Sequence, residues 1–225
     1  MKSGVLWSYD PPLISTERTT VASLLQENDY HTACIGKWHL GLAWAKDSTG
    51  VIDFSKPIGA GPNQLGFDYF YGITASLDIP PYFYVENGRA VQSPTKTIED
   101  HASPNATSDV SGAFFRGGGI SPDFKHKEVL DQFQKKAFAF LDTHKKEHPK
   151  DPFFLYLAYY GPHAPLDAPA SLTDQVLSLK ELEAKGYDNT KAQYKKNKVY
   201  AKDYTEAEVR QQGLALLKGI DNGVG

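Results

Sequence analysis

An uninterrupted apolar run, Pro152-Phe-Phe-Leu-Tyr-Leu-Ala-Tyr159, constrains the fold of this chain more than any other feature. A strand with one exposed face alternates apolar and polar residues, whereas a strand that is covered on both faces is apolar throughout. We therefore expect a central strand here, enclosed between helices. The run leads into Gly161-Pro-His-Ala-Pro165, which places His163 at the carboxyl end of the predicted strand.

Two segments with helical spacing precede strand candidates, and this order predicts an α/β fold. An apolar stripe predicts a helix over 19–28 with Thr19 as its N-cap, and the segment 31–35 follows it as a strand candidate. A longer apolar stripe predicts a helix from about Pro122 to His144, directly before the apolar run.

The segment from Tyr82 to Gln92 predicts a β-hairpin, because two short apolar stretches flank the turn residues Asn87-Gly88. The flanking segments 42–81 and 93–122 are rich in glycine, proline and polar residues, and we expect them to be mostly loop. Loops of this length in a compact domain are usually functional or mobile.

Beyond Leu172 the chain is more charged. Thr173 is expected to cap a helix that stops at Gly186, and the Lys- and Tyr-rich segment 187–204 is expected to be a solvated surface insertion. Thr205-Glu-Ala-Glu208 fits a capping box and predicts a final helix. No composition shift marks a domain boundary, so we expect a single α/β unit with insertions over 1–225.

Composition and charge exclude several classes of function. The chain has 24 basic and 27 acidic side chains and a net charge of −3, so it has no basic field for nucleic acid. No apolar run approaches the roughly 18 to 20 residues that a membrane span needs. The segment Met1 to Asp10 has no long apolar stretch, so no signal peptide is evident. Cys34, the single cysteine, excludes an internal disulfide.

The residues with chemical potential follow the two strand candidates. Gly36-Lys-Trp-His-Leu-Gly41 comes directly after the segment 31–35, and open α/β sheets bind ligands at this end of their strands. Lys37 and His39 held there can bind a tetrahedral oxyanion and move a proton. The prolines around His163 fix the backbone and so direct its imidazole. Taken one at a time, each of these residues is more often part of a solvated surface loop than of a functional site.

Three blocks in one order resemble the sulfatase family, the type I sulfatases of the alkaline-phosphatase superfamily. They are Thr32-Ala-Cys-Ile-Gly-Lys-Trp-His-Leu-Gly41, Gly66-Phe-Asp-Tyr-Phe-Tyr-Gly72, and the apolar run with the His163 loop. The resemblance covers about 16–170, with a weaker echo at 209–225. It implies an alkaline-phosphatase-like three-layer α/β/α fold with a mostly parallel central sheet. It also implies a sulfuric ester hydrolase that acts on aryl or carbohydrate substrates.

The resemblance also implies roles for individual residues. Lys37 would contact the sulfate and the nucleophile, and His39 would hydrogen-bond the nucleophile, a formylglycine made from Cys or Ser. His163 would contact the sulfate ester oxygen and protonate the leaving group. Ser76 would support His39 or the substrate. A sulfate ester hydrolase must neutralise charge on equatorial oxygens, and fixed cations do this.

The chain departs from the family where the nucleophile and the metal site are expected. The nucleophile motif, Cys or Ser followed by x-Pro-x-Arg, occurs nowhere in the sequence, and neither do the tandem aspartates of the Ca²⁺ site near the amino terminus. Cys34 is expected to be a buried core residue. Asp221-Asn-Gly223 spells the family's late metal motif but follows a predicted helix, so we assign it to a helix surface and assign no metal ligand.

These departures predict a truncated chain, an internal piece of a sulfatase catalytic domain that has no turnover by itself. A hydrolase of the same superfamily acting on phosphodiesters or phosphonates is one alternative. A non-catalytic module that binds sulfated glycan is another. The resemblance implies a sulfated small molecule or glycan as partner and a periplasmic, secreted or lysosomal location. The sequence determines neither the substrate nor the oligomeric state.

Overall fold

The computed structural model describes residues 4, 6–100, 115–163, 168, 170–187 and 206–224. Its elements, in chain order, are α1 (Val21–Gln26), β1 (His31–Lys37), the 3-10 helix η1 (Pro62–Leu65), β2 (Tyr69–Ile73), β3 (Tyr84–Glu86), β4 (Arg89–Ala90), β5 (Lys96–Ile98), β6 (Gly118–Ile120), the 3-10 helix η2 (His126–Glu128), α2 (Val129–Glu147), β7 (Phe153–Ala158), α3 (Ala170–Thr173), α4 (Leu179–Ala184) and α5 (Glu206–Val224).

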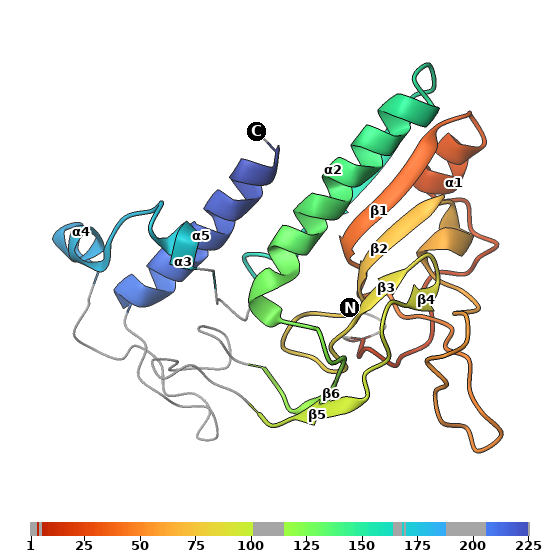
Figure 1. Cartoon of the computed structure of the whole chain (residues 1–225), viewed down its shortest axis with the longest axis horizontal. Helices are drawn as coiled ribbons and strands as arrows, with labels where there is room; N and C mark the ends of the chain where they lie inside the picture. Colours follow the sequence, from red (N-terminus) through yellow and green to blue (C-terminus); the bar gives the residue numbers. More distant parts are fainter. Residues whose placement is uncertain are drawn as a thin grey trace.

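Five strands form the main sheet in the order β4-β3-β2-β1-β7, and β5 and β6 form a separate two-stranded sheet (Figure 1). β1 is parallel to both β2 and β7, whereas β3 and β4 add an antiparallel hairpin to the edge of the sheet. The described sheet therefore combines a parallel half with an antiparallel edge, and the parallel half contains both strands predicted from the sequence.

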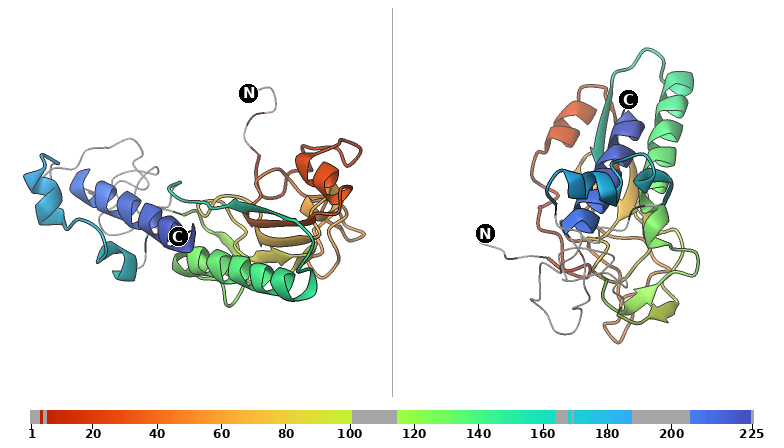
Figure 2. Two further views of the ribbon diagram at one scale, coloured as in Figure 1. Left: turned by 90° about the horizontal axis from the view of Figure 1, so that it is seen from above. Right: turned by 90° about the vertical axis from the view of Figure 1, so that its left-hand side faces the viewer.

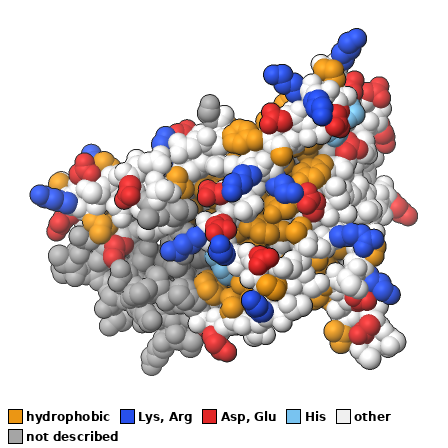
Figure 3. Space-filling model, viewed as in Figure 1, with side chains coloured by type: hydrophobic (Ala, Val, Ile, Leu, Met, Phe, Trp, Pro, Cys, Tyr) orange, Lys and Arg blue, Asp and Glu red, His pale blue; other side chains and the backbone are white. Residues whose placement is uncertain are grey.

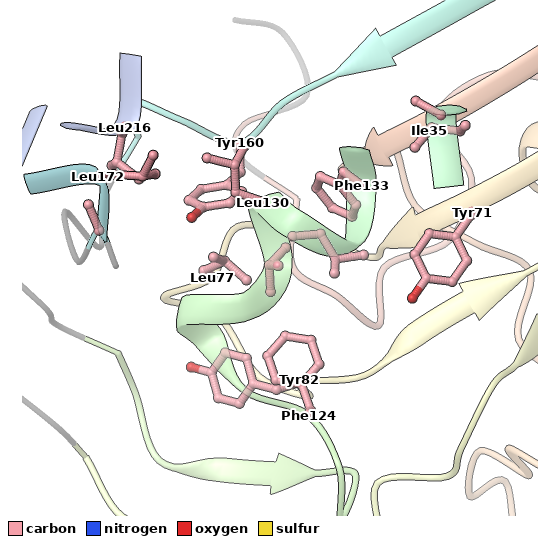
Figure 4. Close-up of a cluster of buried hydrophobic side chains, with 14 of the residues drawn as sticks. Ile35, Tyr71, Leu77, Tyr82, Phe124, Leu130, Phe133, Tyr160, Leu172 and Leu216 are labelled. Atoms are coloured by element: carbon pink, nitrogen blue, oxygen red, sulfur yellow. The ribbon is translucent and has the colours of Figure 1, made fainter. Parts of the chain in front are cut away.

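Helices cover both faces of the parallel strands. α1 lies on one face of the sheet and α2 on the other (Figure 2), and α5 packs against α2. On the α2 side, Phe133, Leu130 and Tyr71 belong to one buried cluster (Figure 4), which α5 joins through Leu216. On the α1 side, Ala22 joins a second buried cluster. The α/β/α layering expected from the sequence is confirmed.

β1, and not the apolar run, is the inner strand of the parallel half. Ala33 and Ile35 belong to the cluster on the α2 side and Cys34 to the cluster on the α1 side, and all three are fully buried. β7 pairs with β1, as expected, but lies at the edge of the described sheet, where Phe153 and Tyr156 are 46% and 49% exposed. The prediction of a central strand at 152–159 is wrong for the described chain, because an apolar pattern indicates covered faces and does not identify a strand's neighbours.

The segment 42–81, expected to be mostly loop, contains β2, the second partner of β1. Its strand character is hidden by Gly72, because glycine is depleted in strands. A Cβ at Gly72 would collide with the carbonyl oxygen of Gly36 in β1. The glycine therefore permits close approach of two paired strands, which is one of the few reasons for glycine inside a strand.

Two predicted helix starts are displaced. Thr20, not Thr19, caps α1: the Thr20 hydroxyl accepts from the Ser23 backbone N–H at 3.0 Å, and the Ser23 hydroxyl accepts from the Thr20 N–H at 2.9 Å. The long helix begins at Val129 rather than near Pro122. A side chain that only resembles a cap is distinguished from the real one by this reciprocal bonding.

The predicted cap at Thr173 is also wrong, because Thr173 ends α3 and Ser178 caps α4. The hairpin turn at Asn87-Gly88 is confirmed, and both residues have positive φ. The final helix is confirmed as α5. Its predicted cap and nearly all of the predicted insertion lie at 188–205, outside the described residues. Within the described ranges, no helix is long and apolar enough to cross a membrane.

A groove of about 310 Å³ lies beside α2, over the first residues of the parallel strands. Figure 3 shows apolar side chains exposed along this part of the surface. Glu86 links two other residues that line the groove: its carboxylate accepts from the Tyr69 hydroxyl and from the Lys136 ammonium, both at 2.6 Å. His31 and Tyr69 begin β1 and β2, so this groove lies toward the end of the sheet opposite Lys37.

Three histidines meet at the same end of the sheet. The Nδ1 atoms of His31 and His144 lie 3.1 Å apart, and Nε2 of His144 lies 3.1 Å from the carbonyl oxygen of Asp151. Because a carbonyl only accepts, Nε2 of His144 is the donor, and the neutral His144 ring accepts from His31 at Nδ1. Burial lowers the pKa of His31, and the nearby His148 and His144 lower it further, against the opposing charges of Asp68 and Asp151.

The lowered pKa of His31 predicts a loss of stability in mild acid. The unfolded chain takes up a proton near pH 6.5, while the folded chain keeps His31 neutral to a lower pH. Stability is therefore complete above that range and falls as the pH drops through it. We expect a lower urea midpoint at pH 5.5 than at pH 7.5, and a smaller difference in His31→Asn. His39 also has a lowered pKa, and because it is present in both proteins, it contributes the same acid-dependent loss of stability to each. An equal loss in both proteins would contradict the prediction.

Candidate functional site at the carboxyl edge of the sheet

The carboxyl ends of β1, β2 and β7 lie at one edge of the sheet because the strands are parallel and in register. Lys37 pairs with Ile73, and Gly36 pairs with Ala158. Gly36 has φ +132°, and a Cβ there would collide with the carbonyl oxygen of Ala158. The glycine before Lys37 is therefore needed for β7 to approach β1, and this approach brings the loop after β7 to the site edge.

Backbone hydrogen bonds hold the turn that carries His39. The backbone N–H groups of Trp38 and His39 donate to the carbonyl oxygens of Ile73 and Thr74 at 3.0 and 3.1 Å. The indole N–H of Trp38 donates to the Gly41 carbonyl at 2.9 Å and closes the turn. His39 has φ 53°, which non-glycine residues rarely adopt. Such backbone geometry persists only where its surroundings enforce it, and it concentrates at functional sites.

The His39 ring has a defined tautomer when neutral. Its Nε2 lies 2.8 Å from the carbonyl oxygen of Leu6, and because a carbonyl only accepts, Nε2 carries the proton. Nδ1 is then the basic nitrogen. Burial lowers the pKa of His39, the charges of Lys37 and His163 lower it further, and the Leu6 carbonyl and Asp78 oppose them. The ring is therefore neutral near pH 7, the state that a proton acceptor needs.

Lys37 supplies a partly buried positive charge beside this ring. Burial lowers the pKa of the Lys37 ammonium, and the negative charge of Asp78 opposes this effect. A charge that is partly removed from water acts on a neighbouring anion more strongly than an exposed one. This is the electrostatic environment that the chemistry of an anionic ester requires.

His163 lies in the loop after β7, where its backbone N–H donates to the Tyr160 carbonyl at 3.0 Å. The side chain is exposed, and its charge acts on His39. The residues that follow it, 164–167, lie outside the described ranges. Lys37 and His163 are far apart in the sequence, but both lie near enough to His39 for their charges to lower its pKa.

Ser76 is placed differently from the three basic residues. It is 3% exposed, and its buried hydroxyl has no hydrogen-bond partner among the described residues. It borders a cavity of about 10 Å³, room for about one water molecule. The backbone carbonyl of Thr74, two residues earlier, accepts from the N–H of His39. The position suits support of the His39 turn better than direct substrate contact.

Sequence reasoning missed the acidic member of the site. The carboxylate of Asp78 acts on both Lys37 and His39, and its Oδ2 accepts from Nη1 of Arg116 at 2.6 Å. Asp78 lies two residues after Ser76, a predicted site residue, and this proximity in the sequence could have identified it as a candidate. No sequence signal pointed to Arg116, because 38 residues separate it from Asp78.

Two residues that resemble functional groups lie elsewhere. Cys34 is fully buried in β1, and burial raises the pKa of its thiol to about 12, so it is not an activated nucleophile. Asp221 and Asn222 lie within α5, as predicted, where the Asp221 carboxylate accepts from Lys218 at 2.9 Å. The Asn222 side chain donates to that of Gln175 at 3.1 Å.

The described residues do not fit the metal that the resemblance implies. Across 6–100, 115–163 and the described part of the carboxyl-terminal region, no group of three or more His, Cys, Asp or Glu side chains could hold a metal ion. Ca²⁺ takes six to eight oxygen ligands, mostly carboxylates and carbonyls. No step of the chemistry is therefore assigned to a metal bound by this chain.

These features define an α/β domain with a cluster of basic side chains at the carboxyl edge of a parallel sheet. The chain belongs to the sulfatase family: the sulfatase family profile matches residues 2–212. This match extends beyond the segment of about 16–170 on which the three motif blocks lie. It confirms the family resemblance and includes every predicted site residue.

Named relatives agree with the family. The chain is 30% identical over 189 residues to an N-acetylgalactosamine-6-O-sulfatase from Bacteroides thetaiotaomicron, covering 72% of this chain and 35% of that protein. It is 26% identical over 195 residues to human arylsulfatase H, covering 68% of this chain and 33% of that protein. The chain thus spans about a third of the length of these relatives.

A solved structure supports the fold. It comes from work on the metabolism of multiple glycosaminoglycans by Bacteroides thetaiotaomicron, and it matches with a TM-score of 0.60 and 22% sequence identity. The match covers 99% of this chain and 45% of that chain. The alkaline-phosphatase-like fold expected from the sequence is confirmed for the part of the domain present here.

Proposed function

We propose that this chain supplies the central part of a sulfatase active site, and that the whole protein hydrolyses sulfate esters. One observation supports the proposal: Lys37 ends β1, and β1 pairs in parallel with β7, the strand that precedes the His163 loop. The charges of Lys37 and His163 act on His39 at this edge and lower its pKa. Sulfate ester hydrolysis needs fixed positive charge at the sulfate oxygens and groups that move protons. This cluster supplies both.

Each residue has a distinct role in the proposed reaction. The Lys37 ammonium binds an equatorial sulfate oxygen and neutralises the charge that develops as the sulfur–oxygen ester bond breaks. His39 is neutral, and its basic Nδ1 accepts a proton from the nucleophile. His163 contacts the ester oxygen and protonates it as it leaves. Ser76 supports the His39 turn.

Sulfatases use a formylglycine nucleophile and Ca²⁺, and the described residues provide a place for neither. Cys34 is the only cysteine, and it is buried within a strand. Under this proposal, the nucleophile and the metal ligands belong to parts of the protein that the described residues do not include. Under this proposal residues 1–225 are inactive by themselves, although they carry three side chains that contact the sulfate or its ester oxygen.

Sulfated carbohydrate is the proposed substrate class. The N-acetylgalactosamine-6-O-sulfatase is the relative that this chain matches at 30% identity over 189 residues. A sulfated sugar also offers hydroxyl groups to the polar side chains of this edge. Such substrates occur outside the cytoplasm, which agrees with the periplasmic, secreted or lysosomal location that the family suggests.

The chain of residues 1–225 is expected to show no turnover of an aryl sulfate, with or without Ca²⁺. Fixed cations alone do not hydrolyse the ester, because no residue in this sequence can become formylglycine. The measurement is an aryl sulfate assay on protein whose folding has been verified by circular dichroism. A longer chain that includes a Cys- or Ser-x-Pro-x-Arg motif and the metal ligands is expected to be active.

Two results would contradict this expectation. Turnover by the 1–225 chain that disappears in Cys34→Ala would make Cys34 a nucleophile. Turnover that survives Cys34→Ala would require a mechanism without formylglycine. An extended chain that hydrolyses phosphodiesters or phosphonates but no sulfate ester would favour the alternative hydrolase of the same superfamily.

A further inference from the structure

An exposed tryptophan follows the residue whose carbonyl contacts the His39 ring. Trp7 is 53% exposed, and the carbonyl of the preceding residue, Leu6, accepts from Nε2 of His39 at 2.8 Å. The Trp7 backbone N–H donates to the Asp10 carboxylate at 2.6 Å. The backbone N–H of Leu42 donates to the Asp10 carbonyl at 3.1 Å, which ties this turn to the segment after His39. These bonds fix the backbone of the turn, and about half of the Trp7 surface faces solvent.

A guanidinium lies over the Trp7 ring. Cζ of Arg116 is 5.7 Å from the ring centroid. Nη1 of Arg116 donates to Oδ2 of Asp78 at 2.6 Å and to the Asp78 carbonyl at 3.1 Å, while the Arg116 side chain keeps 35% of its surface exposed. The Tyr82 hydroxyl donates to the Arg116 carbonyl at 2.8 Å and fixes the backbone. Arg116 is therefore oriented by contacts on both sides.

Asp78 connects this pair to the proposed sulfate site. Its charge acts on Lys37 and on His39, and its other contacts orient Arg116. Trp7 thus adjoins the residue that contacts His39, and Arg116 pairs with the carboxylate whose charge acts on Lys37. An exposed aromatic ring beside an oriented guanidinium is a combination that binds sugars, because the ring packs against apolar C–H faces and the guanidinium binds hydroxyl or anionic groups.

We propose that Trp7 and Arg116 form a subsite for the sugar ring that carries the sulfate ester held by Lys37. The face of the indole that Arg116 does not cover packs against the apolar face of the sugar ring, and the guanidinium hydrogen-bonds a neighbouring hydroxyl or anionic substituent. This inference rests on the proposed function, since it needs the sulfate at Lys37. It names the residues that distinguish a sulfated sugar from sulfate alone.

The test compares two probes on the 1–225 chain by NMR titration: inorganic sulfate and N-acetylgalactosamine 6-sulfate. Trp7→Ala is expected to weaken binding of the sulfated sugar about fivefold, in line with the loss of one aromatic contact, and to leave sulfate binding unchanged. Arg116→Lys keeps the charge opposite Asp78 but loses the planar fork, and it is expected to weaken the sugar selectively as well. Lys37→Ala is expected to weaken both probes.

Phe138→Ala is the matched control, because Phe138 is a similarly exposed aromatic residue of α2, at 52%. It is expected to change neither dissociation constant. Sulfate binding with no loss of sugar affinity in Trp7→Ala would overturn the subsite and leave the proposed function standing. Equal weakening of both probes in Trp7→Ala would show that Trp7 only supports His39, which also overturns the subsite. Failure of the unchanged chain to bind sulfate would overturn the proposed function and the subsite with it.

Discussion

Replacing Lys37 with alanine, in an extended chain that carries the nucleophile motif, is expected to lower kcat by about 100-fold or more. KM is expected to change far less, because the ammonium is needed most as negative charge develops on the sulfate oxygens. The partial burial that lowers the pKa of Lys37 also strengthens its interaction with that charge. Steady-state kinetics on an aryl sulfate measures both parameters.

Two further variants make this result specific. Lys37→Arg is expected to restore little activity, because a planar guanidinium does not replace a compact ammonium in a confined position. Lys46→Ala removes a lysine from the loop after the site and is expected to leave kcat unchanged. Turnover in Lys37→Ala equal to that of the parent protein would remove Lys37 from the active site.

Gly36→Ala is expected to destabilise the fold by about 3 kcal/mol or more, the range of the most damaging single substitutions. Gly36 has φ +132°, and its added Cβ would meet the backbone of Ala158 in the paired strand β7. Backbone atoms of a paired strand cannot move aside as a flexible side chain can. The β1–β7 pairing, and with it the position of the His163 loop, would be disrupted.

Urea unfolding followed by circular dichroism measures this effect, and Gly50→Ala is the matched control. Gly50 also has positive φ, +86°, but a Cβ added there would have no neighbouring atom within 4 Å. This substitution is expected to cost only about 1 kcal/mol, the strain of a left-handed alanine. Equal destabilisation by the two substitutions would show that the close approach at Gly36 contributes nothing.

The fold class was predictable because periodicity and termination signals are local. The apolar stripe before the run 152–159 became α2, the turn at Asn87-Gly88 closed the hairpin, and the late stripe became α5. Strand order was less accessible. β2 was missed because Gly72 weakens its strand pattern, although the glycine is there to accommodate β1. β7 was expected at the centre of the sheet and lies at the edge of its described part.

The candidate site divides in the same way. Lys37, His39 and His163 were identified from the sequence, because each follows a predicted strand within a motif block. Asp78 and Arg116 were not, although Asp78 acts on Lys37 and His39 and pairs with Arg116. No short motif links Trp7 to the site either, so the sequence did not predict the proposed subsite.

The sequence by itself determined the α/β class, the motif blocks of the sulfatase family and the three basic residues of the candidate site. These depend on hydrophobic periodicity and on residues a few positions apart. Only the tertiary structure decided the tautomer of His39, the burial of Lys37 and the coupling of Asp78 to Arg116. Those properties arise from contacts such as Leu6 with His39, 33 residues apart, which form only when the chain is folded.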